Sequence, residues 1–248
     1  MITIKTENEI KIIRESGRIL ATVLKEVEKQ VKPGITTIEL DRAAEALILK
    51  HKAKPGFKGY NGFPYSLCTS VNEEIVHSLP SDRVLKEGDI IGLDLGVLYK
   101  EYYSDMAVSV PVGKVSFEAK RLIQVTKKAL KRGIKKAKIG NTTGDIGNTI
   151  QRYVEGQGYG IVRDLCGHGI GKDLHEDPKI PNFGKRNSGE KLVEGMVICI
   201  EPMVTMGDWR LKKADDGYGY STKDNSLTAH FEHTIAITKK GPQILTEI

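Results

Sequence analysis

The segment LKEGDIIGLD at residues 85–94 is echoed by LVEGMVICIE at residues 192–201, an offset of 107 positions. An earlier segment, KPGITT at residues 32–37, is echoed by KIGNTT at residues 138–143, an offset of 106 positions. Two matches at nearly one offset are hard to obtain by chance in a chain of 248 residues. Self-similarity at a fixed spacing indicates a structural repeat, so we predict one unit written twice.

Helix signals open each half of the chain. Thr6-x-x-Glu9 and Thr36-x-x-Glu39 are capping boxes, and apolar residues at helical spacing follow the first of them. Pro33-Gly34 is expected to end the first helix. The corresponding helices of the second half are predicted over Phe117–Ala137 and Asp145–Glu155.

Apolar runs of strand length follow each helix pair. They are Ile90–Val97, Val108–Val112, Met196–Ile200 and Thr234–Ile237. Each half is thus two helices followed by antiparallel strands, which predicts an α+β fold: a curved antiparallel sheet with helices on its outer face. We expect a single catalytic domain over residues 1–248, with pseudo-symmetric halves at approximately 1–113 and 114–248.

The composition is that of an ordinary globular protein, with 39% hydrophobic and 28% charged residues. No apolar stretch is long enough to span a membrane, and the N-terminus lacks the apolar core of a signal peptide. The three cysteines, Cys68, Cys166 and Cys199, are widely spaced, which argues against a disulfide framework or a cysteine zinc site. We expect them to be small apolar fillers in a cytoplasmic protein.

A basic cluster, KKALKRGIKKAK, covers Lys127–Lys138 within a net charge of +6. Its helical spacing is compatible with an ordinary solvated helix face. It is also compatible with a patch that contacts RNA or another polyanion. The sequence leaves both interpretations open.

The strongest chemical signal is a set of carboxylates inside apolar strands. Asp94 follows Ile90–Leu93, Glu201 follows Val197–Ile200, and Glu232 precedes the run from His233 to Ile237. Burial of an ionised carboxylate without a partner costs on the order of several kcal/mol of folding free energy. Each acid therefore needs a cation, a proton or a metal. Salt bridges to Lys or Arg are the ordinary alternative, but no basic residue interrupts the first two strands.

Asp94 and Asp105 point to a metal. A turn centred on Tyr99-Lys100 would place them directly opposite each other across a hairpin, about 5 Å apart, where like charges repel. A shared divalent cation would remove this repulsion, and one aspartate would bridge two ions in a binuclear site. Asp94 and Glu201 occupy equivalent positions in the repeat, which places the site on the pseudo-twofold axis.

His168 is framed by glycines in the segment GHGIG, which allows unusual backbone angles and a close approach to an ion. One imidazole added to four carboxylates gives a hard, oxygen-rich site. Such a site suits Mn, Fe(II) or Co better than a structural zinc.

Together these residues resemble the type I methionine aminopeptidases, metallopeptidases of the M24 family with the pita-bread fold. The resemblance covers nearly the whole chain. The segments that carry it are CTSVNEEIVHSLP (68–80), DLGVLYKEYYSD (94–105), GHGIGKDLHEDP (167–178), EPM (201–203) and FEHT (231–234).

The resemblance implies removal of the initiator methionine from nascent polypeptide N-termini, with a small second residue preferred. It implies two divalent ions, of Co, Mn, Fe(II) or Zn, held by Asp94, Asp105, His168, Glu201 and Glu232. Glu201 would also shuttle the proton of the attacking water. His175 would donate to the scissile carbonyl oxygen, and His77 would contact the peptide near the scissile nitrogen. A monomer is implied, and Lys127–Lys138 is a candidate ribosome contact.

A methionine side chain needs an apolar, aromatic-lined pocket. By position, the candidates for its lining are Phe57, Tyr60, Phe63, Cys68, Leu174 and Tyr218, with His77 and His175 at its edge. Three of them depart from the family pattern: Tyr218 stands where Trp is frequent, Leu174 where an aromatic is common, and Phe63 where Tyr is common. The sequence therefore predicts an apolar pocket but does not decide which of these residues line it.

Two rival hypotheses remain. Proline-specific peptidases share this fold, but they carry a large N-terminal domain for which the residues before Asp94 leave no room. A non-catalytic relative that binds partners or RNA would usually lack metal ligands, and all five are present here. The distance from His168 to Glu201 also leaves no room for the helical insertion of type II members.

Overall fold

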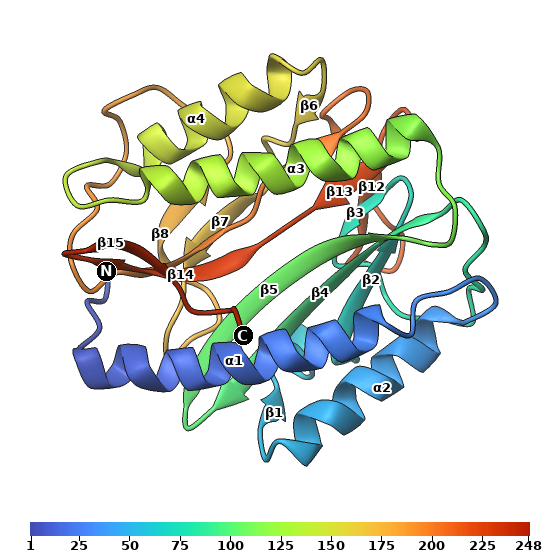
Figure 1. Cartoon of the computed structure of the whole chain (residues 1–248), viewed down its shortest axis with the longest axis horizontal. Helices are drawn as coiled ribbons and strands as arrows, with labels where there is room; N and C mark the ends of the chain where they lie inside the picture. The colour runs from blue at the N-terminus through green and yellow to red at the C-terminus, as the bar shows by residue number, and fades with distance from the viewer.

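The computed structural model describes residues 1–248, and its four long helices lie on one side of the sheets (Figure 1). The helices are α1 (Glu7–Glu28), α2 (Thr37–Lys50), α3 (Phe117–Lys136) and α4 (Thr143–Glu155). Capping boxes at Thr6 and Thr36 confirm the predicted helix starts. Helix α1 ends at Glu28, so Pro33-Gly34 does not end it as predicted but lies in the connection to α2. No helix is both long enough and apolar enough to cross a membrane.

Two antiparallel sheets lie beneath the helices (Figure 1), the arrangement that the resemblance to the pita-bread fold predicts. The first contains β1 (Lys54–Pro55), β2 (Leu67–Val71), β4 (Ile90–Tyr99) and β5 (Tyr102–Pro111). The second contains β7 (Cys166–Gly169), β8 (Glu176–Pro181), β9 (Val197–Ile200), β14 (His233–Thr238) and β15 (Gly241–Ile244). All four predicted strands are confirmed within these sheets.

Two smaller three-stranded sheets complete the architecture. One joins β6 (Gly160–Ile161), β10 (Met203–Thr205) and β13 (Thr228–His230). The other joins β3 (Glu74–Val76), β11 (Leu211–Lys213) and β12 (Tyr220–Thr222). A short 3₁₀ turn, η1 (Tyr60–Gly62), lies between β1 and β2.

The register of the β4–β5 hairpin differs from the prediction. Asp94 is opposite Ala107, and Asp105 is opposite Gly96, so the two aspartates are diagonal neighbours rather than direct partners. The reason is the turn, which is centred on Lys100-Glu101. Both residues have positive φ, 48° and 67°, as a two-residue hairpin turn that matches the strand twist requires. Since side chains alternate with period two, both aspartates still share one face.

Equivalent backbone hydrogen bonds recur in the two halves. The amide of Gly34 donates to the carbonyl of Leu85 at 2.9 Å, and that of Gly140 donates to Leu192 at 3.1 Å. The isolated bridges Thr36–Val84 and Thr142–Lys191 form a second equivalent pair. We infer from these matches that the sequence repeat is a repeat of structure.

Each helix pair packs on its own apolar core. Helices α1 and α2 bury leucines, valines and isoleucines against β2 and β4, and α3 and α4 do the same against β9, β13 and β14. A third cluster lies between these two cores and contains Cys68 and Cys199, both buried as the filler prediction expects. Cys166 is only half-buried, and all three cysteines are free.

The two main sheets are connected at Thr234. Its hydroxyl accepts from the amide of Asp105 at 2.9 Å and donates to the carbonyl of the same residue at 2.8 Å. Close by, the amide of Glu232 donates to the carbonyl of Ala107 at 2.9 Å. The edge of β5 is thereby held against the start of β14, and the acids of one sheet face those of the other.

Replacing Thr234 with Val should therefore weaken the junction. The variant keeps the shape of the side chain but leaves both backbone groups of Asp105 unpaired, so the free energy of unfolding should fall by about 1–3 kcal/mol. Urea denaturation followed by circular dichroism measures it. Thr22→Val is the control, because its hydroxyl bonds only to the carbonyl of Arg18 one turn earlier in α1, and a change within about 0.5 kcal/mol is expected. Equal losses in the two variants would contradict a special role for Thr234.

Candidate metal centre

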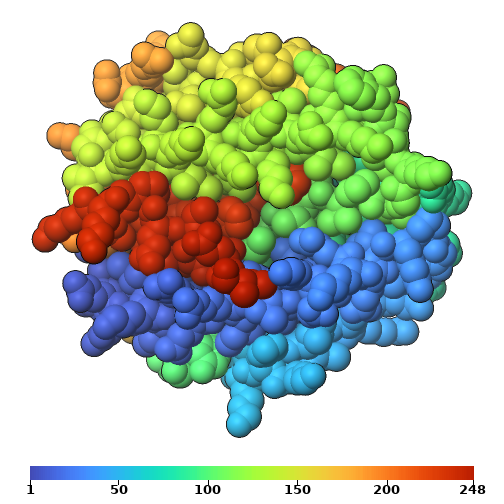
Figure 2. Space-filling model, in the orientation of Figure 1, coloured from blue at the N-terminus to red at the C-terminus, as the bar shows by residue number.

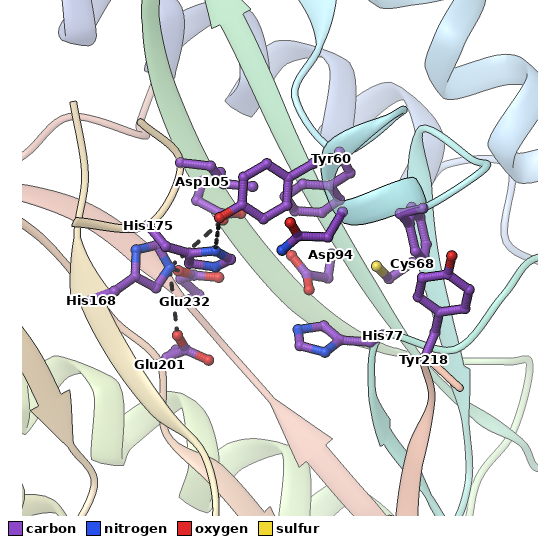
Figure 3. Close-up of a pocket in the computed structure, with 14 residues that line it drawn as sticks. Tyr60, Cys68, His77, Asp94, Asp105, His168, His175, Glu201, Tyr218 and Glu232 are labelled. Carbon is purple, nitrogen blue, oxygen red and sulfur yellow. Dashed lines mark hydrogen bonds and ion pairs between the residues drawn. The ribbon is translucent and has the colours of Figure 1, made fainter. Parts of the chain in front are cut away.

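Strands of both main sheets bring the predicted ligands to one cavity. Asp94 and Asp105 extend from β4 and β5, and His168 lies in β7. Glu201 directly follows β9, and Glu232 directly precedes β14. All five side chains line one cavity of about 170 Å³ and converge on its floor (Figure 3).

The distances are short enough for shared ions. His168 Nε2 lies 3.8 Å from Glu201 Oε1 and 4.0 Å from both Asp105 Oδ2 and Glu232 Oε1. Ligand atoms of Asp94, Asp105 and Glu232 all lie within 4.8 Å of one another. A second group within the same limit combines His168 and Glu232 with the thiol of Cys199.

Burial and mutual repulsion dominate the electrostatics of the four acids. Burial raises the pKa of Asp94 to about 6. For Asp105, Glu201 and Glu232, burial first and the neighbouring carboxylates second raise the pKa well above the ordinary value. Burial lowers the pKa of His168 to about 3, so its imidazole is neutral and free to act as a ligand.

The salt-bridge alternative fails in this structure. No Lys or Arg lies within 4.0 Å of any of the four carboxylates. One buried oxygen on each of three acids also has no hydrogen-bond partner: Asp94 Oδ1, Asp105 Oδ1 and Glu232 Oε1. Buried acceptors of this kind need a cation, and hard oxygen donors with one neutral imidazole fit divalent cations.

All the residues predicted for the substrate pocket line the same cavity, next to the acids. Phe57, Phe63, Cys68 and Leu174 are buried, while Tyr60 and Tyr218 are half-buried. The rings of Phe63 and Tyr218 meet edge to face with centroids 5.5 Å apart. The result is an apolar, aromatic-walled recess whose floor carries the acids (Figure 3).

Two further histidines lie in the cavity. His175 Nδ1 is 2.9 Å from the hydroxyl of Tyr60, and its ring lies 4.3 Å from that of His168. His77 lies across the cavity near Tyr218 (Figure 3), and burial lowers its pKa to about 4. Burial also lowers the pKa of His175. Both imidazoles are therefore neutral near pH 7 and can donate hydrogen bonds.

The sequence analysis missed three residues of this region. Asn61 lines the cavity from the 3₁₀ turn η1, and no motif marked it. Cys199 was predicted only as a filler, although it is two positions before Glu201, and residues two apart in a strand share a face. His230 is 3% exposed, and its Nε2 lies 3.5 Å from Glu201 Oε2. It ends β13, whereas Glu232 directly precedes β14 in another sheet, so strand alternation could not have linked the two residues.

A buried cluster of acids and one neutral imidazole beside an apolar recess is the arrangement of a metal-dependent hydrolase. A profile of the metallopeptidase family M24 matches residues 11–239, and the chain belongs to that family. It is 50% identical over its whole length to the whole methionine aminopeptidase of Clostridium perfringens. The structure also matches the crystal structure of methionine aminopeptidase from Thermotoga maritima, with 45% sequence identity and a TM-score of 0.98. This match covers 100% of each of the two chains. Family M24 implies divalent metal ions.

The likeness to proline-specific relatives is weaker. The prolidase of Pyrococcus horikoshii shares 27% identity and gives a TM-score of 0.79. The match covers 98% of this chain but only 63% of the prolidase. The two proteins share the fold of the matched region, and the rest of the prolidase has no counterpart in the match.

The repulsion among the acids gives a test that needs no substrate. Asp105→Asn should raise the melting temperature of the EDTA-treated protein at pH 7 by about 2–4 °C for each ~1 kcal/mol of relieved repulsion. The folded state holds the Asp105 proton to a higher pH than the unfolded chain does. The acid therefore costs stability as pH rises above its unfolded pKa, and the advantage of Asn should vanish near pH 4.

Mn²⁺ stabilises the folded protein in proportion to how tightly it binds. Since Asp105 is a candidate ligand, the same variant should lose most of the stabilisation that Mn²⁺ gives the parent protein. Scanning calorimetry with and without Mn²⁺ measures both effects. Asp208→Asn is the control, since Asp208 is paired with Arg210 on the surface. A lower melting temperature for Asp105→Asn in EDTA would contradict the assigned repulsion.

Proposed function

We propose that this chain removes the N-terminal methionine of nascent polypeptides by two-metal hydrolysis of the first peptide bond, with a small second residue preferred. The observation that carries the proposal is the convergence of four acids and one imidazole beside an apolar, aromatic-walled recess. Identity of 50% with a methionine aminopeptidase over the full length of both chains supports the choice of methionine over proline substrates.

Asp94, Asp105, His168, Glu201 and Glu232 would hold two divalent cations. When bound, the cations supply Lewis acidity that lowers the pKa of water and polarises the scissile carbonyl. The oxygen-rich donors are compatible with Co, Mn or Fe(II), and Zn also tolerates them.

The side chains around this centre divide the remaining work. Glu201 takes a proton from the attacking water and later passes it to the leaving amine, as a positioned carboxylate with a raised pKa can do. His175, oriented by the hydroxyl of Tyr60, donates to the scissile carbonyl oxygen as negative charge develops on it. His77, across the cavity, contacts the peptide near the scissile nitrogen.

The recess provides side-chain selection. Phe57, Phe63, Cys68, Leu174 and Tyr218 offer ring edges and apolar surface that suit an unbranched thioether. Tyr60 lies between this wall and His175, so side-chain binding and carbonyl orientation are linked.

The activity is tested with two peptides. EDTA-treated protein should release no methionine from Met-Gly-Met-Met, and added Mn²⁺ or Co²⁺ should restore release while a prolyl dipeptide stays intact. Glu201→Gln should lower kcat by at least ~10², the lower limit of a general acid–base contribution. Liquid chromatography of free methionine measures both. Cleavage of the prolyl dipeptide alone would support the prolidase alternative, and no cleavage with any metal would refute the proposal.

We also propose that the protein acts as a monomer and docks on the ribosome through α3. The basic residues of Lys127–Lys138 are exposed on the face of α3 that Figure 2 shows in yellow-green. Polyanions attract such faces over distances of about a Debye length, roughly 8 Å at physiological salt. This docking would bring the cavity to emerging N-termini.

Reversing the charge of Lys131, Arg132, Lys135 and Lys136 to Glu should lower ribosome co-sedimentation at least ~10-fold at low salt, because steering by exposed charges is lost. Release of methionine from the tetrapeptide should stay unchanged. The control reverses three exposed lysines near the end of α2, Lys50, Lys52 and Lys54. Equal co-sedimentation of the two variants would refute docking through α3.

A further inference from the structure

One imidazole at the centre has no part in the reaction described so far. His230 ends β13, with 3% of its surface exposed. Two other histidines of this region have partners: His168 Nδ1 lies 2.9 Å from the carbonyl oxygen of Gly169, and His233 Nδ1 lies 2.9 Å from Thr246 Oγ1. His230 Nε2 is buried with no hydrogen-bond partner. An ordinary structural histidine would not leave a buried ring nitrogen unpaired.

The backbone of His230 is held on both sides by one residue. Its amide donates to Ser109 Oγ at 2.8 Å, and Ser109 Oγ donates to its carbonyl at 2.9 Å. Ser109 belongs to β5, the strand that also carries Asp105. The backbone that carries the imidazole is therefore fixed relative to the strand of Asp105, as the support of a functional group requires.

The nearest acidic atom to His230 Nε2 is Glu201 Oε2, at 3.5 Å. The other oxygen of the same carboxylate, Oε1, lies 3.8 Å from His168 Nε2. The backbone carbonyl of Glu201 accepts from Asn182 Nδ2 at 2.9 Å, which fixes the start of the side chain but not its end. Glu201 thus lies between two imidazoles, one on each carboxylate oxygen.

We propose that His230 is a positioning residue whose Nε2–H group donates a hydrogen bond to Glu201 Oε2 and thereby keeps Oε1 on the side of His168, where these two residues would help to hold a divalent cation. The inference rests on the proposed function for the roles of Glu201. It needs the ring proton on Nε2, the nitrogen that is buried without a hydrogen-bond partner and lies 3.5 Å from Glu201 Oε2. Hydrogen bonds behind a metal ligand typically change metal affinity or activity about 10–100-fold.

The test is a double-mutant cycle on metal binding, measured by calorimetric titration of EDTA-treated, dialysed protein with Mn²⁺. His230→Leu should weaken Mn²⁺ binding about 10-fold or more, within the usual range for such supporting bonds. His230→Gln should bind Mn²⁺ with an affinity within about 3-fold of the parent protein. The glutamine amide nitrogen reaches a similar position and can donate a hydrogen bond to Glu201. In a Glu201→Ala background, His230→Leu should cause no further loss, since its partner is gone.

His233→Leu is the matched control, because it removes a half-buried imidazole that bonds to Thr246 and not to Glu201. It should leave Mn²⁺ affinity unchanged, and thermal melts of all EDTA-treated variants separate loss of fold from loss of binding. In the metal-saturated enzyme, His230→Leu should lower kcat with KM unchanged, and His230→Gln should recover it.

Three results would each overturn the proposal: unchanged Mn²⁺ affinity in His230→Leu, an equal loss in the Glu201→Ala background, or no recovery with Gln. Failure of the proposed function is distinguishable, because it would appear as an inactive parent protein whatever the binding cycle shows.

Discussion

Four carboxylates share a small buried volume with no lysine or arginine to neutralise them, and the rest of the structure is arranged around this constraint. Burial raises the pKa of all four acids, and neighbouring carboxylates raise it further for Asp105, Glu201 and Glu232. Three of the acids keep a buried oxygen without a hydrogen bond. An isolated site of this kind would open or bind protons. Here two of the acids lie within strands of one sheet and two directly border strands of another, and each sheet is fixed by a helix pair and an apolar core. The packing of the two halves keeps the acids together, and divalent cations are the partners that fit their donor atoms.

The junction between the halves is correspondingly polar and specific. Thr234 pairs with both backbone groups of Asp105, and Ser109 pairs with both backbone groups of His230. In each case one hydroxyl replaces the strand ladder where the sheets separate. The two hydroxyls provide hydrogen bonds for the buried backbone groups at the junction. A continuous sheet would also pair these groups, but it would close the cavity. The junction therefore depends on a few side chains, and a substitution of one of them is expected to disturb the positions of the nearby acids.

Much of this could be predicted from the sequence because its signals are local. The capping boxes at Thr6 and Thr36 involve residues three apart, and acids within apolar runs need no knowledge of the fold to stand out. The register of the β4–β5 hairpin was wrong by one position at the turn, since Lys100 and Glu101 are not the residues that usually adopt positive φ. Asn61 and His230 were missed for another reason. Their roles come from neighbours far along the chain, and only the assembled structure brings those neighbours close.

The surroundings of Glu201 show how one carboxylate can serve two purposes. A ligand must hold its geometry, whereas a proton shuttle must exchange a proton without moving far. Its two oxygens face different imidazoles, at 3.8 Å on the side of His168 and 3.5 Å on the side of His230. If the side chain could rotate freely, the same oxygen would have to serve in turn as ligand and as base. A donor on the far oxygen removes that freedom at little entropic cost, because the backbone of His230 is already fixed by Ser109. Positioning of this kind comes from rigid strands on both sides of the cavity, which explains why a site with so few residues needs the whole two-half fold.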